Sequence, residues 1–198
     1  MVITNARIKI LKLLLANPTQ EYTIRGISLE TKVNYRLVHQ EVIKLEKIEL
    51  ITVKKIGASK VCKINLSYDL SLFSYIESLR KNELLKKHVS LIVINTELDK
   101  IKSKYFTCIL FGSYVTGKIK KTSDIDLLFI IPNNTKVEQF EYEIESLFQT
   151  FNYKMDINVI TENSVNELKQ KSGLNVLNET IKNHIVLYGT EQYYNLIK

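Results

Sequence analysis

The residues best suited to chemistry lie in one stretch, FGSYVTGKIKKTSDIDLLFIIP, which spans residues 111–132. Asp124 and Asp126 stand at the start of an apolar run, and side chains two apart on a strand project from the same face. Two carboxylates this close repel each other unless a cation lies between them, and Mg²⁺ prefers oxygen ligands. The pair is therefore either the polar end of a buried strand or part of a metal site.

A Gly-Ser pair and a third acid favour the metal site. Gly112 and Ser113 follow an earlier apolar run, where the missing Cβ lets backbone N–H groups approach phosphate oxygens and the hydroxyl can donate another bond. Asp156 lies in a later strand-like run and can complete a set of three acids. A Gly-Ser pair, ten residues, an Asp-x-Asp pair and a later strand acid form a far more specific pattern than any part alone.

The elements around these residues alternate between strands and helices. Three apolar runs are predicted to be strands: YFTCILF, IDLLFII (ended by Pro132) and YKMDINVI. Between the last two, VEQFEYEIESLFQTF predicts a helix with one apolar face, made of Val137, Phe140, Ile144, Leu147 and Phe151. The pattern predicts an α/β (α+β) domain over residues 90–198, a small mixed sheet covered by helices.

Positive charge is concentrated ahead of this domain. The chain has a formal net charge of +7. Residues 1–69 hold twelve Lys and Arg against six acids, which gives +6 and leaves the remainder at +1. The asymmetry indicates either that the N-terminal part meets a polyanion or that it has a well-solvated basic surface.

Periodicity gives the basic part a shape. A first helix should present Ile8, Leu11, Leu14 and Leu15 on one face and end before Pro18. A second helix should run from the cap at Thr23 to about Thr31, and a third from Asn34 to Ile48. LITVKKI and KVCKINL then predict a basic hairpin around residues 57–59. We expect a domain at 1–69, a connector helix at 70–89 and the second domain at 90–198.

Three helices and a two-stranded wing resemble the winged helix-turn-helix of prokaryotic regulators, and NYRLVHQEVIKLEKIELI is similar to its recognition-helix segment. The resemblance covers about residues 4–66, with Glu49 standing where such sequences often carry glycine. It implies duplex DNA as a partner, with Arg36, Gln40 and Lys44 on the recognition helix and Lys54, Lys55 and Lys60 on the wing. The alternative is a protein-protein or dimer interface that touches no DNA.

The acid pattern resembles the nucleotidyltransferase superfamily related to DNA polymerase β, especially its minimal branch. GSYVTGKIKKTSDIDL carries the motif, including Gly117 and Ser123, and LNETIKNHIVLYG is similar to the end of that family's domain. The similarity extends over about residues 90–190. Tyr114, Thr116 and Lys120 depart from it, because many relatives have arginines there.

The resemblance implies transfer of a nucleoside monophosphate, AMP from ATP, to a hydroxyl of a protein or small molecule. Asp124, Asp126 and Asp156 would bind two Mg²⁺ ions, and nucleotide contacts would come from Gly112, Ser113, Lys120 and Ser123. Lys118, Lys120 and Lys121 either offset charge on the leaving pyrophosphate or form a solvated loop. Relatives are often antitoxin partners of HEPN-type toxins, which makes such a toxin a candidate acceptor. One alternative is a DNA-binding regulator that senses NTP without turnover. The other is an interaction module that pairs two copies of the chain as a homodimer.

Other residues have simpler interpretations. Cys62 and Cys108 show no metal or disulfide pattern and are expected to be buried thiols. His39, His88 and His184 show no ligand spacing. Tyr188, Tyr193 and Tyr194 either stack on a base or cap the edge of a core. No apolar run is long enough to span a membrane, so we expect a cytoplasmic protein with no membrane partner.

Overall fold

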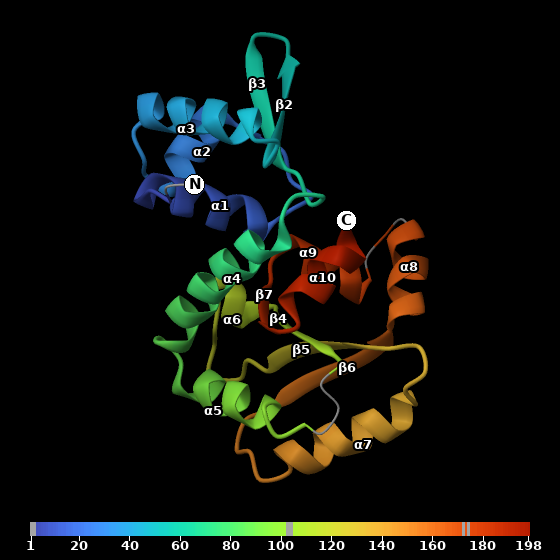
Figure 1. Ribbon diagram of the computed structural model, residues 1–198. Helices are drawn as coiled ribbons and strands as arrows, with labels where there is room; N and C mark the ends of the chain where they lie inside the picture. The colour runs from blue at the N-terminus through green and yellow to red at the C-terminus, as the bar shows by residue number, and fades with distance from the viewer. Residues whose placement is uncertain (1–2, 102–104, 172, 174) are drawn as a thin grey trace.

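The computed structural model describes residues 3–101, 105–171, 173 and 175–198 (Figure 1). It confirms a mixed α+β protein. The elements follow in this order: α1 (Asn5–Ala16), β1 (Tyr22–Thr23), α2 (Ile24–Thr31), α3 (Tyr35–Lys47), β2 (Ile51–Ile56), β3 (Ser59–Ile64), α4 (Leu70–Leu85), α5 (Val89–Leu98), β4 (Thr107–Phe111), α6 (Ser113–Thr116), β5 (Ile125–Ile131), α7 (Val137–Phe148), β6 (Met155–Thr161), α8 (Glu162–Gln170), α9 (Val176–Lys182), β7 (Ile185–Tyr188) and α10 (Thr190–Ile197).

The three N-terminal helices begin where side chains can cap them. Thr4, Thr23 and Asn34 each accept a hydrogen bond from a backbone N–H in the first turn of the helix that follows. Such caps satisfy donors that have no partner inside the helix. Helix α3 turns one apolar face to the core, because Val38, Val42 and Leu45 are all buried.

The chain leaves α3 through an unusual turn. Glu49 has a φ of 60°, a left-handed conformation that favours glycine. Its N–H still donates to the carbonyl of Glu46, so the turn forms without glycine. It delivers the chain into the predicted hairpin, in which β2 and β3 pair antiparallel from Ile51 opposite Ile64 to Ile56 opposite Ser59.

The second sheet has the strand order β6-β5-β4-β7. Strand β4 pairs antiparallel with β5 and β7, and β5 pairs parallel with β6. Helices α5 and α7 cover one face, packing on Leu127, Phe129 and other residues of β5 that point to that side. Helices α8, α9 and α10 cover the other face, which holds Leu128 and Ile130 (Figure 1).

Side-chain alternation along β5 therefore decides which face carries the acids. Asp126 is two residues before Leu128, so its carboxylate lies on the face covered by α8 to α10. The strand predicted at IDLLFII is confirmed as β5, and Asp124 directly precedes it. One detail of the sequence prediction is wrong: Phe151 lies beyond the end of α7, where Phe148 fills the core instead.

Helix α4 joins the N-terminal elements to the second sheet. Phe73 and Ile76 of α4 belong to an apolar core that includes residues of α1 to α3 as well as α8 to α10. On the same helix, buried Glu77 accepts hydrogen bonds from the Val186 backbone N–H and from Arg80. Arg80 in turn donates to the carbonyl of His184. The buried ion pair thus fixes α4 against β7.

No helix within the described residues is long and apolar enough to cross a membrane.

Replacing Glu77 tests whether this contact holds the fold together. Glu77→Gln leaves the buried Arg80 guanidinium without its counter-charge, which should lower the free energy of unfolding by about 3–5 kcal/mol. The matched control is Glu83→Gln, which removes the largely exposed partner of Lys12 and should cost less than about 1 kcal/mol. Urea unfolding measures both. Equal losses in the two variants would contradict the role given to Glu77.

Candidate active site

The Gly-Ser turn and one carboxylate are in direct contact. Gly112 follows β4 and caps α6 with φ 71° and ψ −145°, a conformation open mainly to glycine. A Cβ placed on Gly112 would lie 1.9 Å from Oδ2 of Asp126. The Asp126 carboxylate accepts a hydrogen bond from the backbone N–H of Ser113. The turn is therefore shaped around this acid.

Strand register brings a second carboxylate beside the first. Asp126 is opposite Phe111 on β4 and opposite Asp156 on β6. Asp156 is exposed, and its Oδ1 accepts a long hydrogen bond of 3.4 Å from the amide of Asn158. Because side chains in register on parallel strands project from the same face, the Asp126 and Asp156 side chains lie on one face of the sheet.

The surroundings of Asp126 oppose its ionisation. Burial is the largest cause that raises the pKa of the Asp126 carboxyl, and the negative charges of Asp156, Asp124 and Glu179 raise it further. The hydrogen bond from Ser113 lowers it in part. The site thus holds acids together at a cost in free energy that a bound cation would relieve.

Asp124 meets a cation from Lys154, the residue that precedes the neighbouring strand β6. The ammonium of Lys154 lies 2.7 Å from Oδ2 of Asp124, while Oδ1 is buried and has no hydrogen-bond partner among the described residues. Sequence reasoning missed Lys154. The only available signal was its place two residues before Asp156, which puts both side chains on the same side of the strand.

The donor set fits a hard divalent cation, although the acids do not form a ready-made cage. In the part of the chain that the structure describes, no three His, Cys, Asp or Glu side chains are grouped as a metal cluster. Lys154 also occupies one carboxylate oxygen of Asp124. The unpartnered Oδ1 of Asp124 and the oxygen-only chemistry of the three acids suit Mg²⁺.

The loop between the turn and the acids is held by local bonds. Gly117 closes α6 in a left-handed conformation, and the N–H of Lys118 donates to the carbonyl of Ser113. The Ser123 hydroxyl accepts from the N–H of Lys120, so in this structure it shapes the loop. Lys118, Lys120 and Lys121 are exposed. Their predicted roles toward phosphate stay predictions.

The residues predicted to contact DNA fall into distinct groups. Arg36 and Gln40 are exposed on α3, whereas Lys44 forms an ion pair with buried Glu41. On the hairpin Lys55 is directly opposite Lys60. Lys54 is adjacent to Lys55 in the strand and therefore projects from the other face.

A groove adjoins this surface. It has a volume of about 770 Å³ and lies between α2, the start of α3 and the hairpin. Its lining includes Arg25, Tyr35, His39 and Lys60 and contains no acid. Arg25 and Tyr35 were not among the predicted contacts. The groove is positively charged, and Lys60 joins it to the tip of the hairpin.

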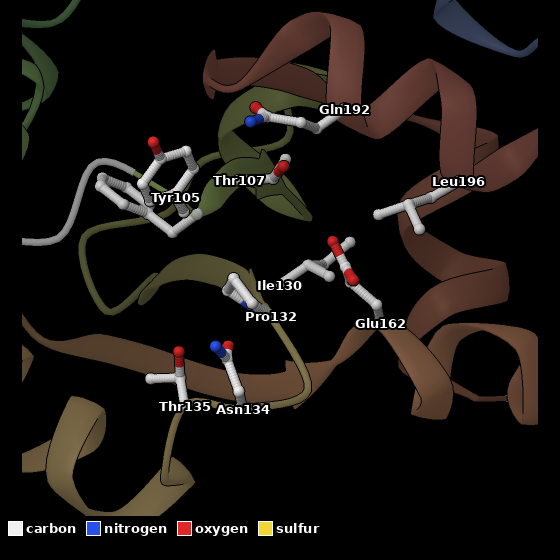
Figure 2. A pocket seen from close by; sticks show the side chains of 10 residues that line it. Tyr105, Thr107, Ile130, Pro132, Asn134, Thr135, Glu162, Gln192 and Leu196 are labelled. Carbon is white, nitrogen blue, oxygen red and sulfur yellow. The ribbon is translucent and has the colours of Figure 1, made fainter.

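Figure 2 shows a hollow in the second domain. It has a volume of about 400 Å³ and lies at the end of the second sheet opposite to the acids. Thr107 and Ile130, which are opposite each other in the β4–β5 register, lie on its wall, whereas Phe111 and Asp126 mark the far end of the same strand pair. None of the predicted site residues lines it. The hollow is therefore separate from the acids.

The remaining predictions have clear outcomes. Cys62 and Cys108 are buried free thiols, and burial, the main cause, raises the pKa of Cys62 to about 11. Tyr193 and Tyr194 are fully buried, so they belong to the core and are not available to stack on a base. Tyr188 stacks on Phe106, with ring centroids 4.4 Å apart.

Comparison with protein families agrees with the C-terminal geometry. The family model described as Polymerase beta, Nucleotidyltransferase matches residues 96–193. The matched segment contains the Gly-Ser turn and all three acids, and it supports a nucleotidyltransferase domain in this part of the chain. Such enzymes take an NTP and, in general, a divalent metal. Searches of curated proteins and of solved structures found no match to the chain.

Two glycines in the same loop test the contact between the turn and Asp126. Gly112→Ala places a methyl group on the Asp126 carboxylate in a backbone conformation that only glycine adopts readily, and should cost about 2–5 kcal/mol of unfolding free energy. Gly117→Ala has the same φ of 71° but meets no atom within 4 Å, and should cost about 1 kcal/mol. Urea denaturation would reveal the difference, and equal costs would show that Asp126 does not press on the turn.

Proposed function

We propose that the protein is a Mg²⁺-dependent nucleotidyltransferase that transfers AMP from ATP to a hydroxyl group of an acceptor. One observation carries this proposal: the Asp126 carboxylate lies against the Gly112–Ser113 turn, with Asp156 beside it in register. The turn would bind phosphate and the acids would bind metal. Their contact is what phosphoryl transfer from a nucleotide requires.

The residues of the turn would hold the nucleotide. The backbone N–H of Gly112 and the hydroxyl of Ser113 would bind the β- and γ-phosphates, and exposed Lys120 would offset charge as pyrophosphate leaves. Ser123 keeps the loop in shape through its bond to the N–H of Lys120. These assignments are supported by the exposed loop that starts at the turn.

The acids would act at the α-phosphorus. The acceptor oxygen forms a bond to that phosphorus as the bond to the bridging oxygen breaks, and pyrophosphate departs with the electron pair. Asp156 would take the proton of the acceptor hydroxyl. Asp124, Asp126 and Asp156 would hold two Mg²⁺ ions, which when bound stabilise the attacking and leaving oxygens.

The exposed position of Asp156 supports a large acceptor. Strand β6 is an edge strand of its sheet, and the Asp156 side chain is open to solvent. A protein surface can therefore approach this side of the acid set. Together with the resemblance to antitoxin partners of HEPN-type toxins, this supports a protein hydroxyl as acceptor.

Removing one carboxylate tests the chemistry. Asp126→Asn should lower transfer at least about 100-fold, because losing a metal ligand costs several kcal/mol of transition-state stabilisation. The assay follows pyrophosphate release and the label from α-labelled ATP in a cell lysate, with and without EDTA. Asp99→Asn, at the end of α5, serves as the control and should keep full activity. More than about a tenth of the wild-type rate in Asp126→Asn would contradict the proposal.

For the N-terminal unit we propose a winged helix-turn-helix that binds duplex DNA. Lys55 and Lys60 support it, because like charges directly across a strand pair are destabilising and here both are exposed. A polyanion would relieve their repulsion. Arg36 and Gln40 would face base edges from α3, and the lysines of the hairpin would contact phosphates.

Salt dependence tests this binding. In the double variant Lys55→Ala/Lys60→Ala the slope of log K against log salt should fall by about 2, since two phosphate contacts are lost. The urea midpoint of unfolding of this double variant should not be lower than that of the wild type, because the cross-strand repulsion between Lys55 and Lys60 is removed. Lys136→Ala, ahead of α7, is the control and should leave the slope unchanged. Absence of any duplex binding at ~50 mM salt would exclude the DNA-binding role.

A further inference from the structure

Lys154 is placed by the backbone. The N–H of Ile125 donates to the carbonyl of Lys154 at 2.9 Å, which continues the β5–β6 ladder by one step beyond Asp126 and Asp156. That step puts the Lys154 side chain beside Asp124, and the ammonium reaches Oδ2 at 2.7 Å. Strand pairing therefore places the backbone of Lys154 next to Asp124, within reach of its flexible side chain.

The charges around this contact are mostly negative. Asp156 and Glu179 act on Asp126, and Asp156 also acts on Lys154. Within the described residues, Lys154 is the basic side chain that forms an ion pair with one of the three acids. Its side chain is 79% exposed, whereas that of Asp124 is 28% exposed. The lysine therefore approaches the acids from solvent.

We propose that Lys154 is a counter-cation built into the site, which pairs with Asp124 until a divalent cation displaces it. This inference rests on the proposed function, because it assumes that the acids bind a divalent metal. Lys154 would not take part in the transfer itself. It would hold Asp124 near Asp126 while no metal is bound and would set how tightly the metal binds.

The contact has the properties that such an exchange needs. An ammonium on a long, exposed side chain is held weakly, because solvent screens the pair and the stem is flexible. It satisfies one oxygen of Asp124 and leaves the buried Oδ1 without a partner among the described residues. A divalent ion carries twice the charge and binds carboxylate oxygens at about 2.1 Å. Binding of the ion must therefore overcome the existing pair.

The experiment measures Mn²⁺ binding to the full chain by titration calorimetry without nucleotide. Lys154→Met should bind Mn²⁺ about three- to fivefold more tightly than the wild type, since the competing ammonium is gone. Lys154→Arg keeps a cation at the position and should stay close to the wild type. Lys136→Met removes the same charge beyond the other end of β5. Salt screens charges over a Debye length of about 10 Å, so the Mn²⁺ affinity of this control should change less than about 1.5-fold.

Thermal unfolding adds a second readout. Without metal, Lys154→Met should melt at a lower temperature than the wild type, because the acids lose their counter-charge. Saturating Mn²⁺ should then raise its melting temperature by more than it raises that of the wild type. A purely structural lysine would lower the melting temperature with and without metal by the same amount.

Each result decides between the claims. If Lys154→Met binds Mn²⁺ no more tightly than Lys136→Met, the lysine does not compete and the inference is overturned. If the wild type binds no Mn²⁺, or if the double variant Asp124→Asn/Asp126→Asn binds Mn²⁺ as tightly as the wild type, these acids are not the metal site. The proposed function then fails as well. Tighter binding in Lys154→Met that is reversed in Lys154→Arg supports the inference.

Discussion

The repulsion between neighbouring carboxylates at one end of β5 and β6 is the constraint on which the site depends. Backbone pairing puts Asp126 directly opposite Asp156, and burial together with those charges raises the pKa of Asp126. Left alone, such acids would separate. They stay together because both faces of the sheet are packed, by α5 and α7 on one side and by α8 to α10 on the other.

This packing also fixes the register. A shift of β5 by one residue would turn Asp126 toward the face of α5 and α7 and bring Leu127 to the acid side. The apolar side chains on both faces of β5 make that shift costly, since every one of them would exchange surroundings. The stability of the sheet thus offsets the local cost of the acids. Gly112 adds a second constraint, because a larger residue would meet Asp126.

Much of this arrangement could be predicted from sequence, for specific reasons. The motif groups the Gly-Ser pair with the acids, and the apolar runs locate the strands, whereas the contact between Gly112 and Asp126 follows from the β4–β5 register. Lys154 could not be predicted as a partner of Asp124, because it belongs to no motif and acquires its role only through strand pairing. The same holds for Glu77 and Arg80, which read as the polar side of a helix and are buried by β7 and α10.

In the hairpin, too, the sequence does not show which side chains face each other. Composition predicts a basic wing, but only the pairing of β2 with β3 shows that Lys55 and Lys60 are opposite each other and that Lys54 points away. Helix α4 then connects this basic unit to the acid site through one apolar core and a buried ion pair. The positive charge of the hairpin and the negative charge of the acids at β5 and β6 thus lie at two separate places in one molecule.

The central claim is that the acids at the ends of β5 and β6 hold divalent metal against a nucleotide on the Gly112–Ser113 turn. The most direct measurement is a crystal structure with Mn²⁺ and a non-hydrolysable ATP analogue, using anomalous scattering to locate the metal. We predict anomalous peaks between the carboxylates of Asp124, Asp126 and Asp156 and the phosphates, with Lys154 withdrawn from Asp124. A bound nucleotide elsewhere, or metal peaks away from these acids, would contradict the account.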